Sequence, residues 1–112
     1  MIEPWDESKW GALTEENMRR KLMAEGYSVA RYIYPKGTLF SNHVHSVDKK
    51  DAVLEGEFLI TLEGEEFLLR AGDSIEVPRD GVHSAQVVGE ESVVSLDAVK
   101  EEPAPEWPPQ GH

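Results

Sequence analysis

The chain contains no cysteine, which excludes disulfide bonds and any chemistry that depends on a thiolate. Basic residues are half as numerous as acidic ones, 11 lysines and arginines against 22 aspartates and glutamates, and the formal net charge is −11. Because nucleic acids and anionic membranes both attract basic surfaces, we expect neither as a partner. The sequence also lacks an apolar run of membrane-spanning length and a secretory leader, so we expect a cytoplasmic protein.

Length and composition are typical of one soluble domain. The 112 residues are 39% hydrophobic and 29% charged, and a chain of this length buries about two-thirds of the surface that it exposes when unfolded. Changes of pattern divide the sequence into three segments. We expect a helical appendage over residues 1–27, a β-rich domain over residues 28–100, and a proline-rich acidic tail over residues 101–112.

The N-terminal segment carries the signals of a short helix. Thr14 is a favourable N-cap, and the acidic residues that follow it suit the positive end of the helix dipole. Leu13 and Met18 have the spacing of a hydrophobic staple, and Gly26 is typical of the position just beyond a helix end. The sequence therefore predicts a helix between Thr14 and Gly26.

From Ser28 onward the sequence is typical of short β-strands separated by turns. Residues that favour strands are frequent, glycine recurs between the segments, and no second helical pattern follows. The predicted strands are residues 28–34, 38–44, 52–54, 57–62, 65–69, 74–77, 84–88 and 92–99. Glu63-Gly64 has the two-residue length of a tight hairpin. These strands predict an all-β fold, either a sandwich or a barrel.

Three of the four histidines lie in two short motifs. His43-Val-His45 is an H-x-H pair in a predicted strand, where alternate side chains point to the same face. His83 adjoins a later strand and could complete one face of a metal's coordination shell. Imidazole suits divalent transition metals, so we expect a three-histidine site for iron, manganese, nickel, zinc or copper. His112 lies in the predicted tail and is not a candidate ligand.

These residues resemble the two motifs of the cupin family. The first motif, G-x5-H-x-H followed by E-x6-G, is matched at Gly37, His43, His45 and Gly56. The second motif, G-x5-P-x-G-x2-H-x3-N, is matched at Gly72, Pro78 and His83, with Gly81 displaced by one position. The resemblance covers about residues 28–100. It implies a small antiparallel jelly-roll β-barrel that holds a metal near one mouth, which agrees with the predicted strands.

The departures from the family pattern affect the ligand set. Counting back from Gly56 places Lys49 where the family has its glutamate ligand, and Val87 stands where the second motif has asparagine. A protonated lysine cannot ligate a metal, and a dication repels its charge. Three explanations stay open. In the first, the three histidines hold the metal alone. In the second, Asp51 or Asp48 replaces the glutamate. In the third, the metal is lost and Lys49 binds an anion or pairs with Asp51.

Lys49 and Asp51 are the candidate catalytic residues. Lys49 is placed to contact a substrate anion, and Asp51 shares the strand parity of position 49. Asp51 is therefore a candidate proton acceptor or partner of a metal ligand. Apart from its aligned position, the Lys49-Lys50 pair is more typical of a solvated loop. Asp97 could also point into the barrel, but the sequence identifies no partner for a buried carboxylate there.

Two functions from different classes follow. The first is a metal-dependent enzyme of the cupin type, an oxygenase, isomerase or lyase, that acts on a small anionic organic molecule. The second is a non-catalytic cupin that binds or senses a small ligand and has an altered or empty metal site. Because small cupins often associate by pairing strands, a homodimer is expected in either case.

Overall fold

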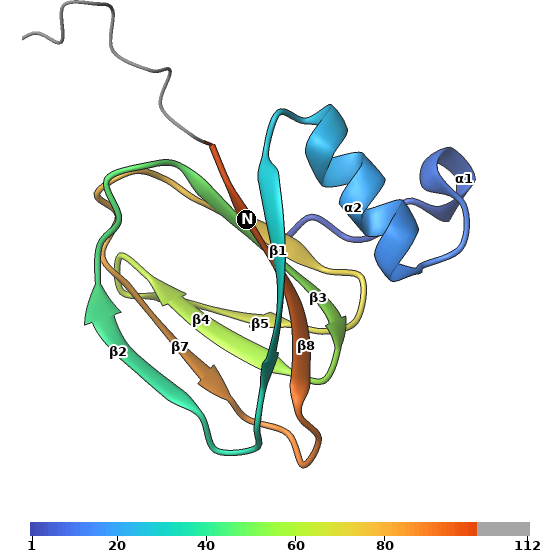
Figure 1. The fold of residues 1–112 in the computed structure, drawn as a ribbon. Coiled ribbons are helices and arrows are strands. Elements are labelled where there is room, and N and C mark those ends of the chain that lie inside the picture. Colours follow the sequence, from blue (N-terminus) through green and yellow to red (C-terminus); the bar gives the residue numbers. More distant parts are fainter. Residues whose placement is uncertain (101–112) are drawn as a thin grey trace, which may run out of the picture.

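The structure, a computed structural model, describes residues 1–100 and contains two β-sheets packed face to face (Figure 1). Each sheet has four antiparallel strands, in the orders β1-β8-β3-β6 and β2-β7-β4-β5. The strands are β1 Ser28–Tyr34, β2 Leu39–His43, β3 Lys49–Glu55, β4 Phe58–Leu62, β5 Glu65–Leu69, β6 Ser74–Val77, β7 His83–Val87 and β8 Val93–Val99. This is the antiparallel jelly-roll barrel that the sequence predicts. The predicted tail lies outside the described residues.

Most predicted strands are confirmed to within one residue, because turn residues mark their ends in the sequence. The Glu63-Gly64 hairpin is also confirmed, since both residues have positive φ angles, 49° and 82°, as a type I′ turn requires. The largest difference is β3, which is predicted over residues 52–54 and in fact extends from Lys49 to Glu55. Its first residues are charged, yet they pair with both β6 and β8.

An apolar core fills much of the space between the two sheets. Its buried members are Val53, Phe58, Ile60, Leu69, Ile75, Val77, Ala85, Val87 and Val93. Because side chains alternate along a strand, Val53 of β3 points into the barrel and Ala52 points to the outer face. The same alternation turns Lys49 and Asp51 inward, where they line the candidate site instead of extending the core.

The N-terminal segment contains two helices. α1 (Glu7–Trp10) is a single turn that the sequence did not predict, whereas α2 (Glu15–Ala24) is the predicted helix. The Thr14 hydroxyl accepts a hydrogen bond from the Asn17 amide at 3.0 Å, which confirms the N-cap. Gly26 follows the helix with a φ of 97°, a left-handed conformation that glycine adopts without steric cost. Neither helix of the described chain has the length and apolar character needed to cross a membrane.

A second apolar core lies beneath α2, which covers the outer face of the β1-β8-β3-β6 sheet (Figure 1). Its buried members are Met18, Leu22, Tyr27, Ala52, Leu96 and Ala98. Three of them come from the N-terminal segment and three from β3 and β8. Residues 1–27 therefore keep an apolar sheet face out of water, which stabilises the barrel as well as the helix.

Four charged side chains fasten the N-terminal segment to β3. The Lys50 ammonium contacts Glu3 and Glu25 at 2.9 Å each, and the Lys21 ammonium contacts the same two carboxylates at 2.6 Å. Lys50 is only 2% exposed. The expectation of a solvated loop is therefore wrong for Lys50. Position 50 faces the underside of the N-terminal segment, where a buried charge needs partners of opposite sign.

We expect this cluster to make the protein less stable in acid. Burial by itself raises the pKa of Glu3 and Glu25, but hydrogen bonds from Lys21 and Lys50 outweigh it and bring both pKa values below the ordinary 4.5. A pKa that folding lowers stabilises the folded state above the unfolded pKa, and this contribution is lost as the pH falls through the folded pKa. Urea unfolding should therefore show a falling free energy of unfolding below a pH of about 4.5.

The Glu25→Gln variant provides the comparison for this titration. It should be less stable than the parent at neutral pH, because Lys50 and Lys21 each lose a charged partner. It should also lose less stability on acidification, because one of the two titrating carboxylates is gone. An identical pH dependence in parent and variant would contradict the assignment.

Candidate metal centre

Strands β2 and β7 bring the three motif histidines together at one end of the barrel. His43 lies directly opposite His83 in the antiparallel register, and their ring centroids are 4.2 Å apart. The His45 centroid lies 4.8 Å from that of His43 and 5.2 Å from that of His83. Ring nitrogens of all three lie within 4.8 Å of one another. The predicted grouping is observed, although β2 ends at His43 and His45 lies in the loop that follows.

Hydrogen bonds to the backbone define which ring nitrogens are free to bind a ligand. His43 Nδ1 lies 2.7 Å from the carbonyl oxygen of Ser41, and His83 Nδ1 lies 2.9 Å from that of Gly81. A carbonyl oxygen can only accept, so each Nδ1 donates the hydrogen bond, and in the neutral ring each Nε2 keeps its lone pair. Partners of this kind also orient histidine ligands in metal sites.

His45 supplies independent support for a bound ion. Its Nε2 is buried and has no hydrogen-bond partner among residues 1–100. Leaving a buried polar atom without a partner costs about 1–3 kcal/mol, and coordination to a metal would remove that cost. The Nε2 atom of His45 and the free Nε2 atoms of His43 and His83 together form a nitrogen donor set that fits a divalent transition metal.

The surroundings favour the neutral form of two of these histidines. Burial lowers the pKa of His45, and the charges of Lys49 and of the other two imidazoles lower it further. Burial also lowers the pKa of His83, and although its hydrogen bond to Gly81 opposes the change, His43 and Lys49 reinforce it. Only a neutral imidazole has a lone pair to donate, so these shifts favour metal binding.

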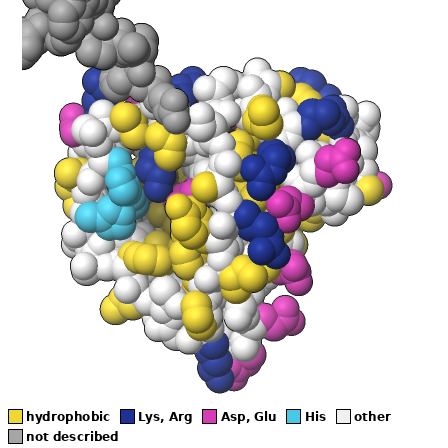
Figure 2. Space-filling model, viewed as in Figure 1, with side chains coloured by type: hydrophobic (Ala, Val, Ile, Leu, Met, Phe, Trp, Pro, Cys, Tyr) yellow, Lys and Arg dark blue, Asp and Glu magenta, His cyan; other side chains and the backbone are white. Residues whose placement is uncertain are grey.

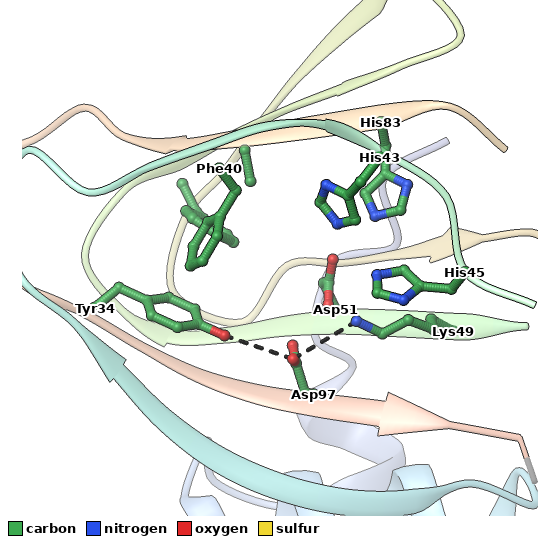
Figure 3. A pocket seen from close by; sticks show the side chains of 10 residues that line it. Tyr34, Phe40, His43, His45, Lys49, Asp51, His83 and Asp97 are labelled. Carbon is green, nitrogen blue, oxygen red and sulfur yellow. Dashed lines mark hydrogen bonds and ion pairs between the residues drawn. The ribbon is translucent and has the colours of Figure 1, made fainter. Parts of the chain in front are cut away.

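The histidines form one wall of a cavity of about 220 Å³ inside the barrel (Figure 3). The other residues that line it are Tyr34, Phe40, Lys49, Asp51, Phe58, Ala85 and Asp97. The cavity is therefore charged on the wall that faces the histidines and aromatic at its far end. Figure 2 shows histidine at the surface beside basic and hydrophobic side chains, so the centre lies at an open mouth of the barrel. A cavity of this size suits a small ligand.

An ion pair and a hydrogen bond meet at Asp97 on the charged wall. Lys49 Nζ lies 3.6 Å from Asp97 Oδ2, and the Tyr34 hydroxyl donates to the same oxygen at 3.5 Å (Figure 3). Lys49 is thus not in a solvated loop, because its side chain is only 12% exposed and faces the cavity. Asp97, for which the sequence identified no partner, has partners on β1 and β3.

Asp51 is the most deeply buried acid of this wall, with 7% of its surface exposed. Burial raises its pKa well above the ordinary value, and the hydrogen bond to Asp97 and the negative charge of Asp97 raise it further. Lys49 acts in the opposite direction without reversing the shift. The raised pKa favours the protonated form of Asp51, in which its carboxyl group can donate a proton.

Neither aspartate that could replace the missing glutamate belongs to the histidine group. Asp48 is exposed, and its carboxylate accepts a hydrogen bond from the Arg79 amide at 2.7 Å. Asp51 lines the cavity but is bonded to Asp97. Val87 is part of the apolar core and offers no ligand atom. Among the described residues, the group that could hold a metal therefore consists of the three histidines, as in the first of the three explanations.

Solved structures share this fold. An RmlC-like cupin from Shewanella frigidimarina NCIMB 400 is 25% identical, with a TM-score of 0.62 over 70% of this chain and 69% of that one. KdgF from Halomonas sp. is 24% identical, with a TM-score of 0.60 over 69% of this chain and 72% of that one. SPY1581, a conserved protein of unknown function from Streptococcus pyogenes, is 22% identical, with a TM-score of 0.63 over 70% and 68% of the two chains.

The sequence itself also places the chain in a family. No curated protein matches the sequence. The family described as the cupin domain, however, matches residues 30–99, a segment that includes both histidine motifs and nearly the whole barrel. Because this match spans well over half of the sequence, the chain belongs to the cupin family.

Proposed function

We propose that this cupin binds a divalent transition metal through His43, His45 and His83 and acts on a small anionic organic molecule in the barrel. The observation that carries the proposal is the buried Nε2 of His45, which has no partner among the described residues and faces two further imidazoles. When bound, the metal would act as a Lewis acid toward an oxygen of the substrate.

The charges around the cavity favour an anionic substrate. Three neutral imidazoles leave a divalent metal with its full positive charge. Lys49 adds an ammonium group on the wall that faces the histidines, where it is placed to contact a carboxylate or another anionic group. Burial and Asp97 raise the pKa of Asp51, and in the protonated form that this favours it can donate a hydrogen bond to a ligand oxygen. Lys49 and Asp51 are therefore the residues to which we assign substrate contacts.

The alternative is a ligand-binding or sensing protein that uses no metal. The position of Lys49 favours it, because an ammonium group whose charge acts on His45 and His83 also repels a dication. In that case Lys49 and the neutral imidazoles would bind a small anion directly. A homodimer and a cytoplasmic location remain expectations from the sequence under either function.

Metal titration of the parent and of two Lys49 variants tests the proposal. The parent should bind about one zinc or nickel ion per chain. Lys49→Met removes the repelling charge and should bind more tightly. Lys49→Glu also restores the family's carboxylate ligand and should bind tighter still, by at least the roughly tenfold change that groups around a metal commonly cause. Isothermal titration with elemental analysis would measure both stoichiometry and affinity.

The pattern of results separates the two functions. Binding by Lys49→Glu alone would identify the parent as the metal-free cupin of the alternative. Absence of binding in all three proteins would overturn the metal proposal and the ligand set together.

A further inference from the structure

Asp51 and Asp97 place two neighbouring carboxyl groups inside the cavity. The two residues lie opposite each other in the antiparallel register of β3 and β8, with both side chains on the inner face. Their side chains are joined by a hydrogen bond. Two ionised carboxylates cannot hydrogen-bond to each other, because neither has a proton to donate. Burial of Asp51 and its hydrogen bond to Asp97 thus favour a state in which the pair shares one proton.

The surroundings of the two carboxyl groups favour that proton on one of them. Asp51 is almost completely buried, and burial disfavours its charged form. Asp97 is the member placed beside the Lys49 ammonium at 3.6 Å and the Tyr34 hydroxyl at 3.5 Å, both of which favour a negative charge. Asp51 is thus placed to act as the acid of the pair and Asp97 as its base. Neighbouring carboxyl groups in unlike environments are the arrangement that acid–base catalysis requires.

The pair also lies where a ligand of the metal centre would be. Both aspartates line the same 220 Å³ cavity as the three histidines, on the facing wall. In Figure 3 the Asp51 carboxyl group points toward the histidines, and Asp97 lies below it beside Lys49. A small molecule with one oxygen at the histidine centre therefore presents its neighbouring atoms to the two carboxyl groups.

We propose that Asp51 and Asp97 act as an acid–base pair that isomerises a small carbonyl acid by moving a proton at the carbon next to its carbonyl group. This inference rests on the proposed function and gives it a reaction class. It requires no oxidant, reductant or second substrate.

The proton balance of such a reaction closes within the pair. Asp97 removes a proton from the carbon, the C–H bond breaks, and its electron pair moves toward the carbonyl oxygen to give an enolate. Asp51 then donates its proton to the enolate oxygen, which gives the enol isomer. This step leaves Asp97 protonated and Asp51 ionised. Transfer of one proton along the hydrogen bond between them restores the starting state.

The first arm of the test examines the proton itself in metal-free protein. Infrared spectra of the full chain with ¹³C-labelled aspartate should show one protonated carboxylic acid per chain at neutral pH. The band should disappear in Asp51→Asn, which keeps the size and hydrogen-bonding capacity of a neutral Asp51. It should persist in Asp73→Asn, which alters a carboxylate outside the cavity. A spectrum with only ionised aspartates would overturn the inference whatever the metal content.

The second arm examines proton transfer by zinc-loaded protein, since zinc has no redox chemistry of its own. Pyruvate, hydroxypyruvate and oxaloacetate are incubated in D₂O, and loss of the C–H signal is followed by ¹H NMR. At least one should exchange faster than in protein-free zinc solution. Asp51→Asn and Asp97→Asn should each slow the exchange by about 10²–10⁴-fold at unchanged zinc content, the range typical of general acid–base groups.

The outcomes of the second arm are equally decisive. Exchange that is unaffected in both variants, or no exchange with any of the three acids, would overturn the reaction class. A protein that binds no zinc would instead contradict the proposed function, and the infrared arm would still decide whether the pair holds its proton.

Discussion

Replacing His83 with alanine is expected to abolish metal binding, from about one ion per chain to none that dialysis and elemental analysis detect. His83 is the proposed ligand from the second motif, and its Nδ1 is already hydrogen-bonded to the Gly81 carbonyl. Without it two imidazoles remain, whereas metal sites with an open position commonly use three protein ligands. The affinity loss should exceed the roughly 10–100-fold that removal of an outer partner of a ligand costs.

Two further variants separate this loss from a general loss of structure. His83 is only 4% exposed, so its alanine variant will also lose packing. His43→Ala alters a half-buried side chain and should lose the metal equally, with circular dichroism showing an intact fold. His112→Ala removes the remaining histidine, which lies outside the described residues, and should bind as the parent does. Retention of the metal by His83→Ala at the parent's affinity would show that the ligand set is wrong.

Replacing Gly56 with alanine is expected to cost more stability than any other glycine-to-alanine change in the turns between strands. Gly56 has a φ of 87°, and a Cβ placed there would lie 2.6 Å from the carbonyl oxygen of Ser92 and 3.0 Å from Cα of Val93. The left-handed backbone costs a residue with a Cβ about 1–2 kcal/mol. Displacing the backbone of β8 and the residue before it should add about 1–3 kcal/mol. This contact explains why a glycine stands at this position of the first motif.

Gly64→Ala is the matched control for Gly56→Ala. Gly64 has nearly the same φ, 82°, but a Cβ there would meet no atom within 4 Å. The Gly64→Ala variant should therefore be destabilised only by the cost of the left-handed backbone conformation. Urea or thermal unfolding of both variants measures the difference, since each kcal/mol shifts the melting temperature of a small domain by roughly 4–8 °C. Equal losses of stability at the two positions would show that the contact of a Cβ at position 56 with β8 does not destabilise the fold.

Features with a local signal could be predicted from the sequence. Turn glycines mark the ends of the strands, and the Thr14 hydroxyl and Gly26 mark the ends of α2, because each of these effects acts within a few residues. The three histidines could be grouped as well, since two share a motif and the third occurs in a second motif with its own spacing. The hydrogen bonds of His43 to Ser41 and of His83 to Gly81 are equally local, because each joins residues two positions apart.

The charged residues of the site and of the sheet could not be predicted in this way. A lysine has no local signal for burial, because its favourable state depends on carboxylates that the chain supplies from far away. Lys49 lies beside Asp97, and Lys50 lies beside Glu3, which is 47 residues distant in sequence. Asp97 and Tyr34 are separated by 63 residues and meet only because β1 and β8 are neighbours.

The sequence by itself thus determined most of the strands, the helix that begins after Thr14, and the candidate ligands His43, His45 and His83. Strand alternation and turn chemistry are short-range, so they can be read without knowing which strands are neighbours. Only the tertiary structure decided which acid of the cavity favours its protonated form. That property follows from placing Asp51 opposite Asp97 across two strands, in a site that excludes water from one carboxyl group and offers a cation to the other.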